Sequence, residues 1–161
     1  MVQYNYRHDR ISALAALSVS AVRKRMGLYL RFQQNNFRAI DVARFRRALL
    51  RHLQGAVILV WDKERIHKGP LITQLRRTYP RLHIESFPGY APELNPTEQM
   101  WNDFKSHTAN SLFRNKQHLR FTLHNNTRRV RRSQVRLRSF ILASDLPSPP
   151  WSYLHYLCET L

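Results

Sequence analysis

The amino-acid sequence predicts an α/β domain in which helices flank a mixed sheet. Strand-like and helix-like hydrophobic periods alternate along the chain, as they do in domains of this class. The run AVILVW at residues 56–61 is apolar and rich in β-branched side chains, which is typical of a strand buried between two covering layers. The chain has 161 residues, the size of one ordinary domain. We therefore expect a single core over residues 1–161.

The first predicted elements are two strands and a helix. Residues 11–19 are apolar with several small side chains and predict a strand buried on both faces. Residues 27–33 alternate in polarity and predict a second strand, which a basic hairpin connection at 20–26 joins to the first. Residues 40–53 carry apolar side chains at spacings of three and four, so we expect an amphipathic helix with Asp41 in its first turn.

The following elements alternate between strand and helix. They are a strand at 56–62, a helix at 69–79, a strand at 82–87, a Pro-rich loop at 88–96 and a helix at 97–107. Pro70 stands near the start of the second helix, where a proline is well tolerated. Trp61 and Trp101 fall on predicted buried elements, which favours core packing over stacking on bases.

The C-terminal third is strongly basic. Residues 114–138 contain nine Lys or Arg and no acid, and a thin apolar stripe at helical spacing predicts one or two basic helices. We divide the domain into a sheet-and-helix core at 1–112, basic helices at 113–145 and a tail at 146–161, which is broken by prolines and then aromatic.

The overall charge indicates a polyanionic partner. Twenty-seven Lys and Arg stand against ten Asp and Glu, for a net charge of +17, and such a surface attracts nucleic-acid phosphates. Ribosomal and RNA-binding proteins share this charge, so composition alone does not choose among them.

Several other classes are disfavoured. One cysteine excludes an internal disulfide framework and suits a reducing compartment, so we expect a cytoplasmic, nucleoid-associated protein. The apolar stretch at residues 11–22 is too short to span a bilayer, and no membrane association is expected. His155 and Cys158 form the only close pair of zinc-ligand type, so we expect no structural zinc. With four glycines in the chain, no phosphate-binding glycine loop is visible.

Two acidic residues stand out by their positions. Asp62 ends the most hydrophobic run, and ligands of open α/β sheets gather outside the carboxyl ends of the strands. The alternative for Asp62 is a cap of the following turn. Glu98 lies in Asn95-Pro96-Thr97-Glu98, a helix start in which local chemistry alone favours a capping role for its carboxylate. The residues by themselves leave both alternatives open.

The segments WDKERIH at 61–67 and FPGYAPELNPTEQMWNDFK at 87–105 together resemble the bacterial insertion-sequence branch of the mariner-like DDE transposases. In that family a strand-ending Asp is followed by a His, and a Pro-Glu-Leu-Asn-Pro-x-Glu loop leads into a helix with Trp and Lys. Asp62 and Glu98 take the places of the family's second and third acids. The upstream segments HDRISALAALS and GLYLRF resemble the strands before the second acid, so the resemblance covers about residues 6–140.

The resemblance implies an RNase H-like fold and metal-dependent DNA strand cleavage and strand transfer. Asp62 and Glu98 would be catalytic metal ligands, and the complete enzyme would use two Mg²⁺ or Mn²⁺ ions. Hard carboxylate oxygens suit these ions, which stabilise the attacking and leaving oxygens of an in-line displacement. DNA, as transposon ends and target, would be the partner, and the family implies a homodimer.

The sequence departs from the family at its start. No Asp or Glu stands where the first acid is required, and Asp9 belongs to the segment leading into the second family strand, so we do not transfer the role to it. The region that would read transposon ends is also missing. We therefore expect an N-terminally truncated domain without its first strand, which is inactive alone and which an upstream transposase fragment would complete. The alternative is a non-catalytic, basic DNA-binding fragment or a defunct remnant.

Basic residues near the motifs and in the C-terminal third are the candidate DNA contacts. For each one, a solvated surface role is the simpler interpretation, whereas the acid-free set as a whole indicates a polyanion. The candidates are Arg65, His67, Lys68, Lys105, Arg114, Lys116, Arg128, Arg129, Arg131 and Arg132.

Overall fold

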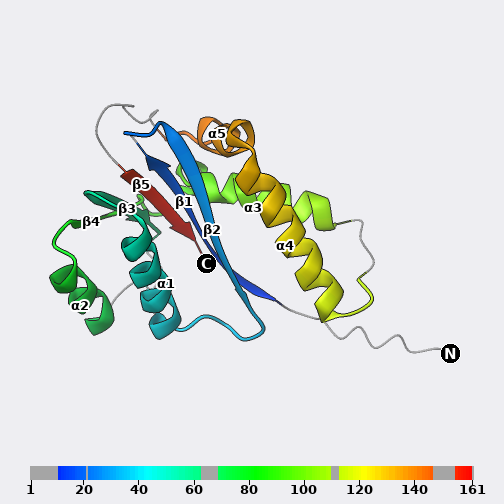
Figure 1. Cartoon of the computed structure of the whole chain (residues 1–161), viewed down its shortest axis with the longest axis horizontal. Coiled ribbons are helices and arrows are strands. Elements are labelled where there is room, and N and C mark those ends of the chain that lie inside the picture. Colours follow the sequence, from blue (N-terminus) through cyan, green and yellow to red (C-terminus); the bar gives the residue numbers. More distant parts are fainter. Residues whose placement is uncertain (1–10, 21, 63–68, 110–112, 147–154, 161) are drawn as a thin grey trace.

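The fold is a five-stranded mixed sheet with helices on both faces (Figure 1). The computed structural model describes residues 11–20, 22–62, 69–109 and 113–146, and the backbone of residues 155–160. The strands are β1 (Ser12–Ser20), β2 (Arg25–Gln33), β3 (Val57–Trp61), β4 (Leu82–Ser86) and β5 (His155–Thr160). They lie in the order β2-β1-β5-β3-β4. β1 is antiparallel to β2 and β5, whereas β3 is parallel to β5 and β4, so the predicted mixed α/β class is confirmed.

Five α-helices cover the sheet. The helices are α1 (Ala39–His52), α2 (Pro70–Thr78), α3 (Pro96–Thr108), α4 (Lys116–Arg132) and α5 (Gln134–Leu142). The first two lie on one face of the sheet and the last three on the other (Figure 1). Each predicted strand and helix up to residue 108 is present, and its ends differ from the predicted ones by at most two residues; the predicted basic region forms the two helices α4 and α5.

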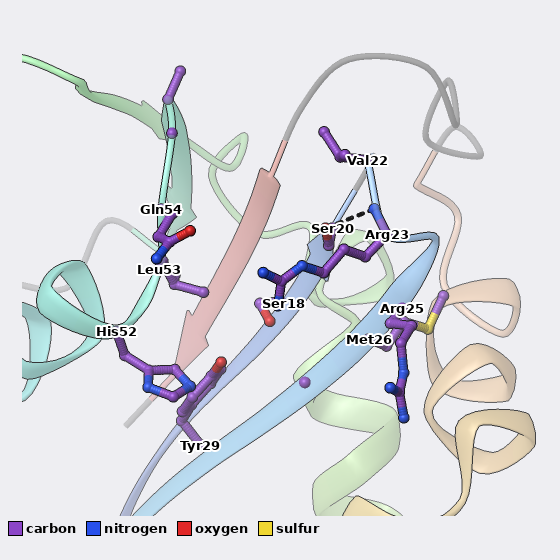
Figure 2. Close-up of a pocket in the computed structure, with 13 residues that line it drawn as sticks. Ser18, Ser20, Val22, Arg23, Arg25, Met26, Tyr29, His52, Leu53 and Gln54 are labelled. Atoms are coloured by element: carbon purple, nitrogen blue, oxygen red, sulfur yellow. Dashed lines mark hydrogen bonds between the residues drawn. The ribbon is translucent and has the colours of Figure 1, made fainter.

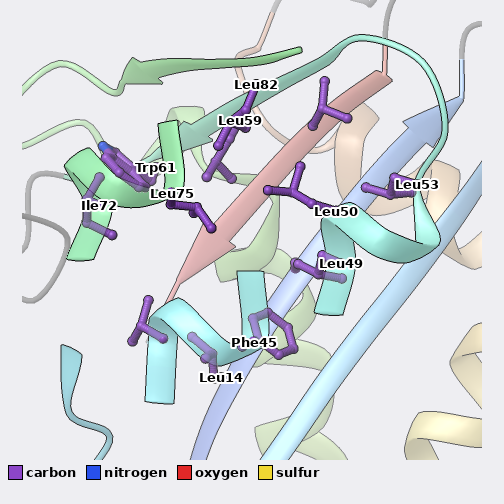
Figure 3. Close-up of a cluster of buried hydrophobic side chains, with 13 residues drawn as sticks. Leu14, Phe45, Leu49, Leu50, Leu53, Leu59, Trp61, Ile72, Leu75 and Leu82 are labelled. Carbon is purple, nitrogen blue, oxygen red and sulfur yellow. The ribbon is translucent and has the colours of Figure 1, made fainter. Parts of the chain in front are cut away.

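Two hydrophobic cores lie on opposite faces of the sheet. The α1-side core contains residues from α1, α2, β1, β3 and β4, of which Figure 3 shows Phe45, Leu59 and Trp61. The α3-side core joins β1 and β2 to α3, α4 and α5. Successive residues of β1 alternate between the two cores, because side chains of a strand point to opposite faces in turn. The prediction of a first strand buried on both faces is therefore confirmed.

The N-terminal ends of the helices follow their local sequence. Asp41 accepts a hydrogen bond from the backbone N–H of Arg38 (3.1 Å) at the start of α1. Pro70 is the first residue of α2, where the missing N–H costs nothing. Asn95 and Asn115 are the N-caps of α3 and α4, and each side chain accepts a backbone N–H of the first turn.

The prediction of a tail at residues 146–161 is wrong for its last part. Residues 155–160 form β5, which lies between β1 and β3 at the centre of the sheet (Figure 1). β5 pairs with β1 from Ser20↔His155 to Ala15↔Thr160, and with β3 as far as Trp61↔Glu159. The pattern did not reveal this because the position of a short strand in a sheet is decided by distant partners.

No helix within the described residues is both long enough and apolar enough to cross a lipid bilayer.

Candidate active site at the carboxyl edge of the sheet

Asp62 directly follows β3, at the edge where the parallel strands β3, β4 and β5 all end. We call this the carboxyl edge. Alternate residues of β3, including Leu59 and Trp61, belong to the α1-side core. Because strand side chains alternate, position 62 falls on the opposite face of the sheet, which is the face that α3 covers. Asp62 is half-buried.

The loop that leads to Glu98 begins at the same edge of the sheet. The backbone N–H of Phe87, just after β4, donates to the carbonyl of Trp61 (2.8 Å), so the loop that leads to α3 starts beside Asp62. Glu98 is half-buried in the first turn of α3. The helix packs on the sheet through Met100, which is fully buried, and Phe104.

Glu98 does not form the capping interaction that its local sequence favoured. The backbone N–H of Asn95, which a capping box would direct to Glu98, donates instead to the carbonyl of Pro92 (3.0 Å). The Asn95 side chain accepts hydrogen bonds from the backbone N–H (3.1 Å) and the hydroxyl (2.7 Å) of Thr97. The start of α3 is thus completed by Asn95 and Thr97, and the Glu98 carboxylate is left for another role.

The donor chemistry fits a divalent cation. Asp62 and Glu98 offer hard carboxylate oxygens on the side of the sheet that α3 covers, and both are partly open to solvent. Within the described residues, no three His, Cys, Asp or Glu side chains gather as a metal-binding group. The two carboxylates are therefore candidates for part of a coordination shell that water, substrate or a further acid would complete.

The candidate DNA-contacting arginines of α4 separate into two pairs. Arg129 donates to Asn126 Oδ1 (2.6 and 3.1 Å) and forms an ion pair with Asp103 of α3 (3.6 Å). Arg131 Nε donates to the carbonyl of Leu28 in β2 (2.7 Å). These two guanidinium groups hold α4 to its neighbours and also keep exposed surface.

Arg128 and Arg132 form the second pair. Both are exposed, and together with His124, Thr127 and Arg131 they line a surface hollow of about 310 Å³. A basic hollow of this kind suits a phosphate group. The remaining candidates Lys105, Arg114 and Lys116 are exposed, whereas Arg65, His67 and Lys68 lie outside the described residues.

A larger hollow of about 570 Å³ lies at the other end of the strands. Figure 2 shows it between the β1–β2 hairpin and the segment that joins α1 to β3, with Ser18, Tyr29 and His52 among its lining side chains. It lies away from the carboxyl edge, because Ala56, which precedes β3, is part of its wall. No pattern in the amino-acid sequence indicated this hollow.

A buried arginine packs against Trp61, the residue that precedes Asp62. The side chain of Arg46 in α1 is 1 % exposed, and its guanidinium carbon lies 4.1 Å from the ring centroid of Trp61. A cation over an indole face is a favourable contact. A sequence signal for this burial existed, because position 46 is four residues after Val42 and falls on the apolar face of the helix.

Residues 2–120 match the family described as DDE superfamily endonuclease. The chain belongs to this family. The match includes Asp62, Glu98 and the strands β3 and β4, and it ends within α4. The mixed sheet with helices on both faces is the RNase H-like fold expected of DDE endonucleases. The search of curated proteins returned no match.

Proposed function

We propose that this chain is the catalytic core of a DDE transposase of the bacterial, mariner-like insertion-sequence type. Its reaction would be metal-dependent cleavage and transfer of DNA strands. The observation that carries the proposal is the placement of Asp62 at the carboxyl edge, beside the loop that leads to Glu98, in a chain of the DDE endonuclease family. DNA is the substrate that this family membership and the charge of +17 support.

Asp62 and Glu98 would hold divalent cations, Mg²⁺ or Mn²⁺. When bound, such ions neutralise the phosphodiester and stabilise the attacking and leaving oxygens. The chain's own part is to keep two carboxylates in place. β3 fixes Asp62 through pairing on both sides, and the Asn95–Thr97 cap fixes the first turn of α3.

The chain alone would not cut DNA on this proposal. The family resemblance implies three acids, and the described side chains supply only two of them at this site. A partner that supplies the missing acid, such as an upstream transposase fragment or a second copy, would be required.

Binding of Mn²⁺ to the purified chain tests the site without relying on activity. Titration monitored by the electron paramagnetic resonance signal of free Mn²⁺ should reveal a bound ion. Asp62→Asn and Glu98→Gln should each weaken its affinity about tenfold or more, because each removes a charged ligand. Glu85→Gln is the matched control, since Glu85 is exposed on β4, and it should leave the affinity unchanged.

Equal Mn²⁺ binding by all four proteins would contradict the proposal. Nicking of supercoiled DNA in Mg²⁺ by the unmodified chain is expected to be absent. Nicking that survives both Asp62→Asn and Glu98→Gln would place the chemistry elsewhere. Metal-independent DNA binding with no Mn²⁺ site would instead favour the non-catalytic DNA-binding function.

A further inference from the structure

Tyr90 is an exposed aromatic residue in the loop between β4 and α3. Its side chain is fully exposed, with a relative accessibility of 106 %, the highest among the large hydrophobic side chains that the structure describes as exposed. Its φ angle is +57°, in the left-handed region that bulky residues rarely adopt. Glycine or asparagine would occupy this position with less strain, and a polar side chain would be better solvated.

The loop is anchored on both sides of Tyr90. Phe87 is buried and bonded to the carbonyl of Trp61. After Tyr90, Pro92–Leu94 form the short 3-10 helix η2, and the carbonyl of Glu93 accepts the backbone N–H of Asp145 (3.0 Å). Tyr90 therefore projects from a fixed segment, and backbone strain retained at such a place is typical of functional positions.

The location of Tyr90 relates it to the candidate active site. It lies three residues after Phe87, whose N–H is bonded to the residue before Asp62, so chain geometry keeps it within about 10 Å of that contact. Eight residues further along the chain comes Glu98. Tyr90 is therefore an exposed aromatic residue near the carboxyl edge.

We propose that Tyr90 stacks on an unpaired base of the DNA beside the bond that is cut. A flat, uncharged ring is suited to the face of a base, whereas phosphates are bound by cations. Bases inside a duplex are already stacked on one another, so the partner is a base at a strand end or one displaced from the helix. The inference rests on the proposed function for the identity of the ligand as DNA, and not on metal binding by Asp62 or Glu98.

Fluorescence anisotropy in EDTA tests the proposal with three DNAs of one sequence. They are a blunt duplex, a duplex with a three-base overhang, and the same overhang with abasic sites. Tyr90→Ala and Tyr90→Asn should weaken binding to the base-containing overhang about tenfold, the order expected for one stacked base. Binding to the other two DNAs should change less than about twofold. Tyr90→Phe keeps the ring and should bind like the unmodified chain.

Phe121→Ala is the matched control, because Phe121 is an exposed aromatic residue of α4 with 64 % accessibility. It should leave the preference for the overhang unchanged. Asparagine suits the left-handed backbone, so Tyr90→Asn should melt at the same temperature as the unmodified chain or higher. Equal losses on all three DNAs, an unchanged affinity for the overhang, or a loss in Tyr90→Phe as large as in Tyr90→Ala would overturn the proposal. Because EDTA removes divalent cations from the assay, failure of this inference and failure of the metal site are distinguishable.

Discussion

Some arginines of this basic chain stabilise the fold, in addition to the arginines that are available to bind nucleic acid. Arg81 follows α2 and reaches back to the end of α1. Its guanidinium donates to the carbonyls of Gly55 (2.6 Å) and Leu53 (2.7 Å) and to that of Leu50. The last carbonyls of a helix have no partner within it and carry the negative end of the dipole. A cation placed there stabilises the helix and fixes the turn into β3.

We expect Arg81→Met to lower the free energy of unfolding by about 2–3 kcal/mol, because it removes several hydrogen bonds from one charged group. Urea unfolding monitored by circular dichroism measures this. Arg77→Met on the exposed surface of α2 is the control, and its effect should stay within about 0.5 kcal/mol. Equal effects of the two substitutions would mean that Arg81 contributes only as a surface charge.

For individual residues, the sequence predicted where each residue lies in the fold better than it predicted which group that residue is hydrogen-bonded to. Asp62 was expected at the end of a buried strand and is found directly after β3, because a continuous apolar run defines a central strand. A helix start was predicted at Asn95-Pro96-Thr97-Glu98, and α3 does begin there, with Asn95 as its N-cap. The sequence did not indicate that the Asn95 N–H would be bonded to Pro92, because the turn of the preceding loop decides that partner.

The helices are held by their caps and by a few cross-links. Asn95 is 5 % exposed and caps α3, the helix that carries Glu98, whereas Asn115 is exposed and caps α4. Asp103 of α3 joins the three helices of its face through ion pairs with Arg129 (3.6 Å) and Arg136 (3.9 Å). These contacts set the position of α3 relative to the sheet.

The two N-caps provide a matched pair of substitutions. Asn95→Ala should lower the free energy of unfolding by about 2 kcal/mol, because it removes a cap and also the hydrogen bond that the buried Thr97 hydroxyl donates to Asn95. Asn115→Ala should lower it by about 1 kcal/mol. Only Asn95→Ala should also weaken Mn²⁺ binding, since it frees the first turn that holds Glu98. Parallel Mn²⁺ titration and thermal unfolding measure both effects, and a loss of Mn²⁺ affinity in Asn115→Ala would contradict this assignment.

The arginines of α4 should separate by function. Arg128→Gln with Arg132→Gln removes two exposed charges of the basic hollow. We expect weaker DNA binding and a salt slope of log K smaller by about 2, with an unchanged melting temperature. Arg129→Gln with Arg131→Gln should lower the melting temperature, because these residues bond to Asn126 and Leu28. Anisotropy at several salt concentrations checks the first pair, and equal losses of stability in the two pairs would refute the division.

Across the whole molecule, the sheet depends on its C-terminal strand. β5 pairs with β1 on one side and with β3 on the other, so its backbone joins the two halves of the sheet. Without it, the strands that flank it would each have an unpaired edge and the apolar faces would lose cover. β5 thus belongs to the same sheet as the family-matched strands, and α4 and α5 pack on one face of that sheet.

Leu157→Pro should disrupt the fold. Proline removes a backbone N–H and is not tolerated in a central strand. We expect loss of the cooperative thermal transition and loss of hydrogen-exchange protection in β1 and β3. Leu157→Ala keeps the N–H and is the control, which should retain a cooperative transition. A cooperative transition in Leu157→Pro would mean that β5 does not complete the sheet in solution.

The limits of prediction at this scale have a physical cause. Strands and helices up to residue 142 follow from periodicity, because each buries one or two faces in a repeating pattern. The central strand β5 could not be predicted from periodicity, since it is short and comes after a stretch rich in proline. Burial of Arg46 was not predicted either. A charged residue on the apolar face of a helix is buried favourably only where it has a partner, and the contact with the Trp61 ring becomes visible only in the folded structure.

The central place of β5 also has a kinetic consequence. The β1–β2 hairpin forms between neighbours in the sequence, whereas Ala15 meets Thr160 only after nearly the whole intervening chain has been made. Pairings between such distant residues must overcome a large loop-closure entropy before they contribute any stability, which slows folding. Until β5 inserts, a gap one strand wide stays open between β1 and β3, and an extended peptide from another molecule can occupy it. Newly made chains are therefore expected to be vulnerable to aggregation and to benefit from chaperones.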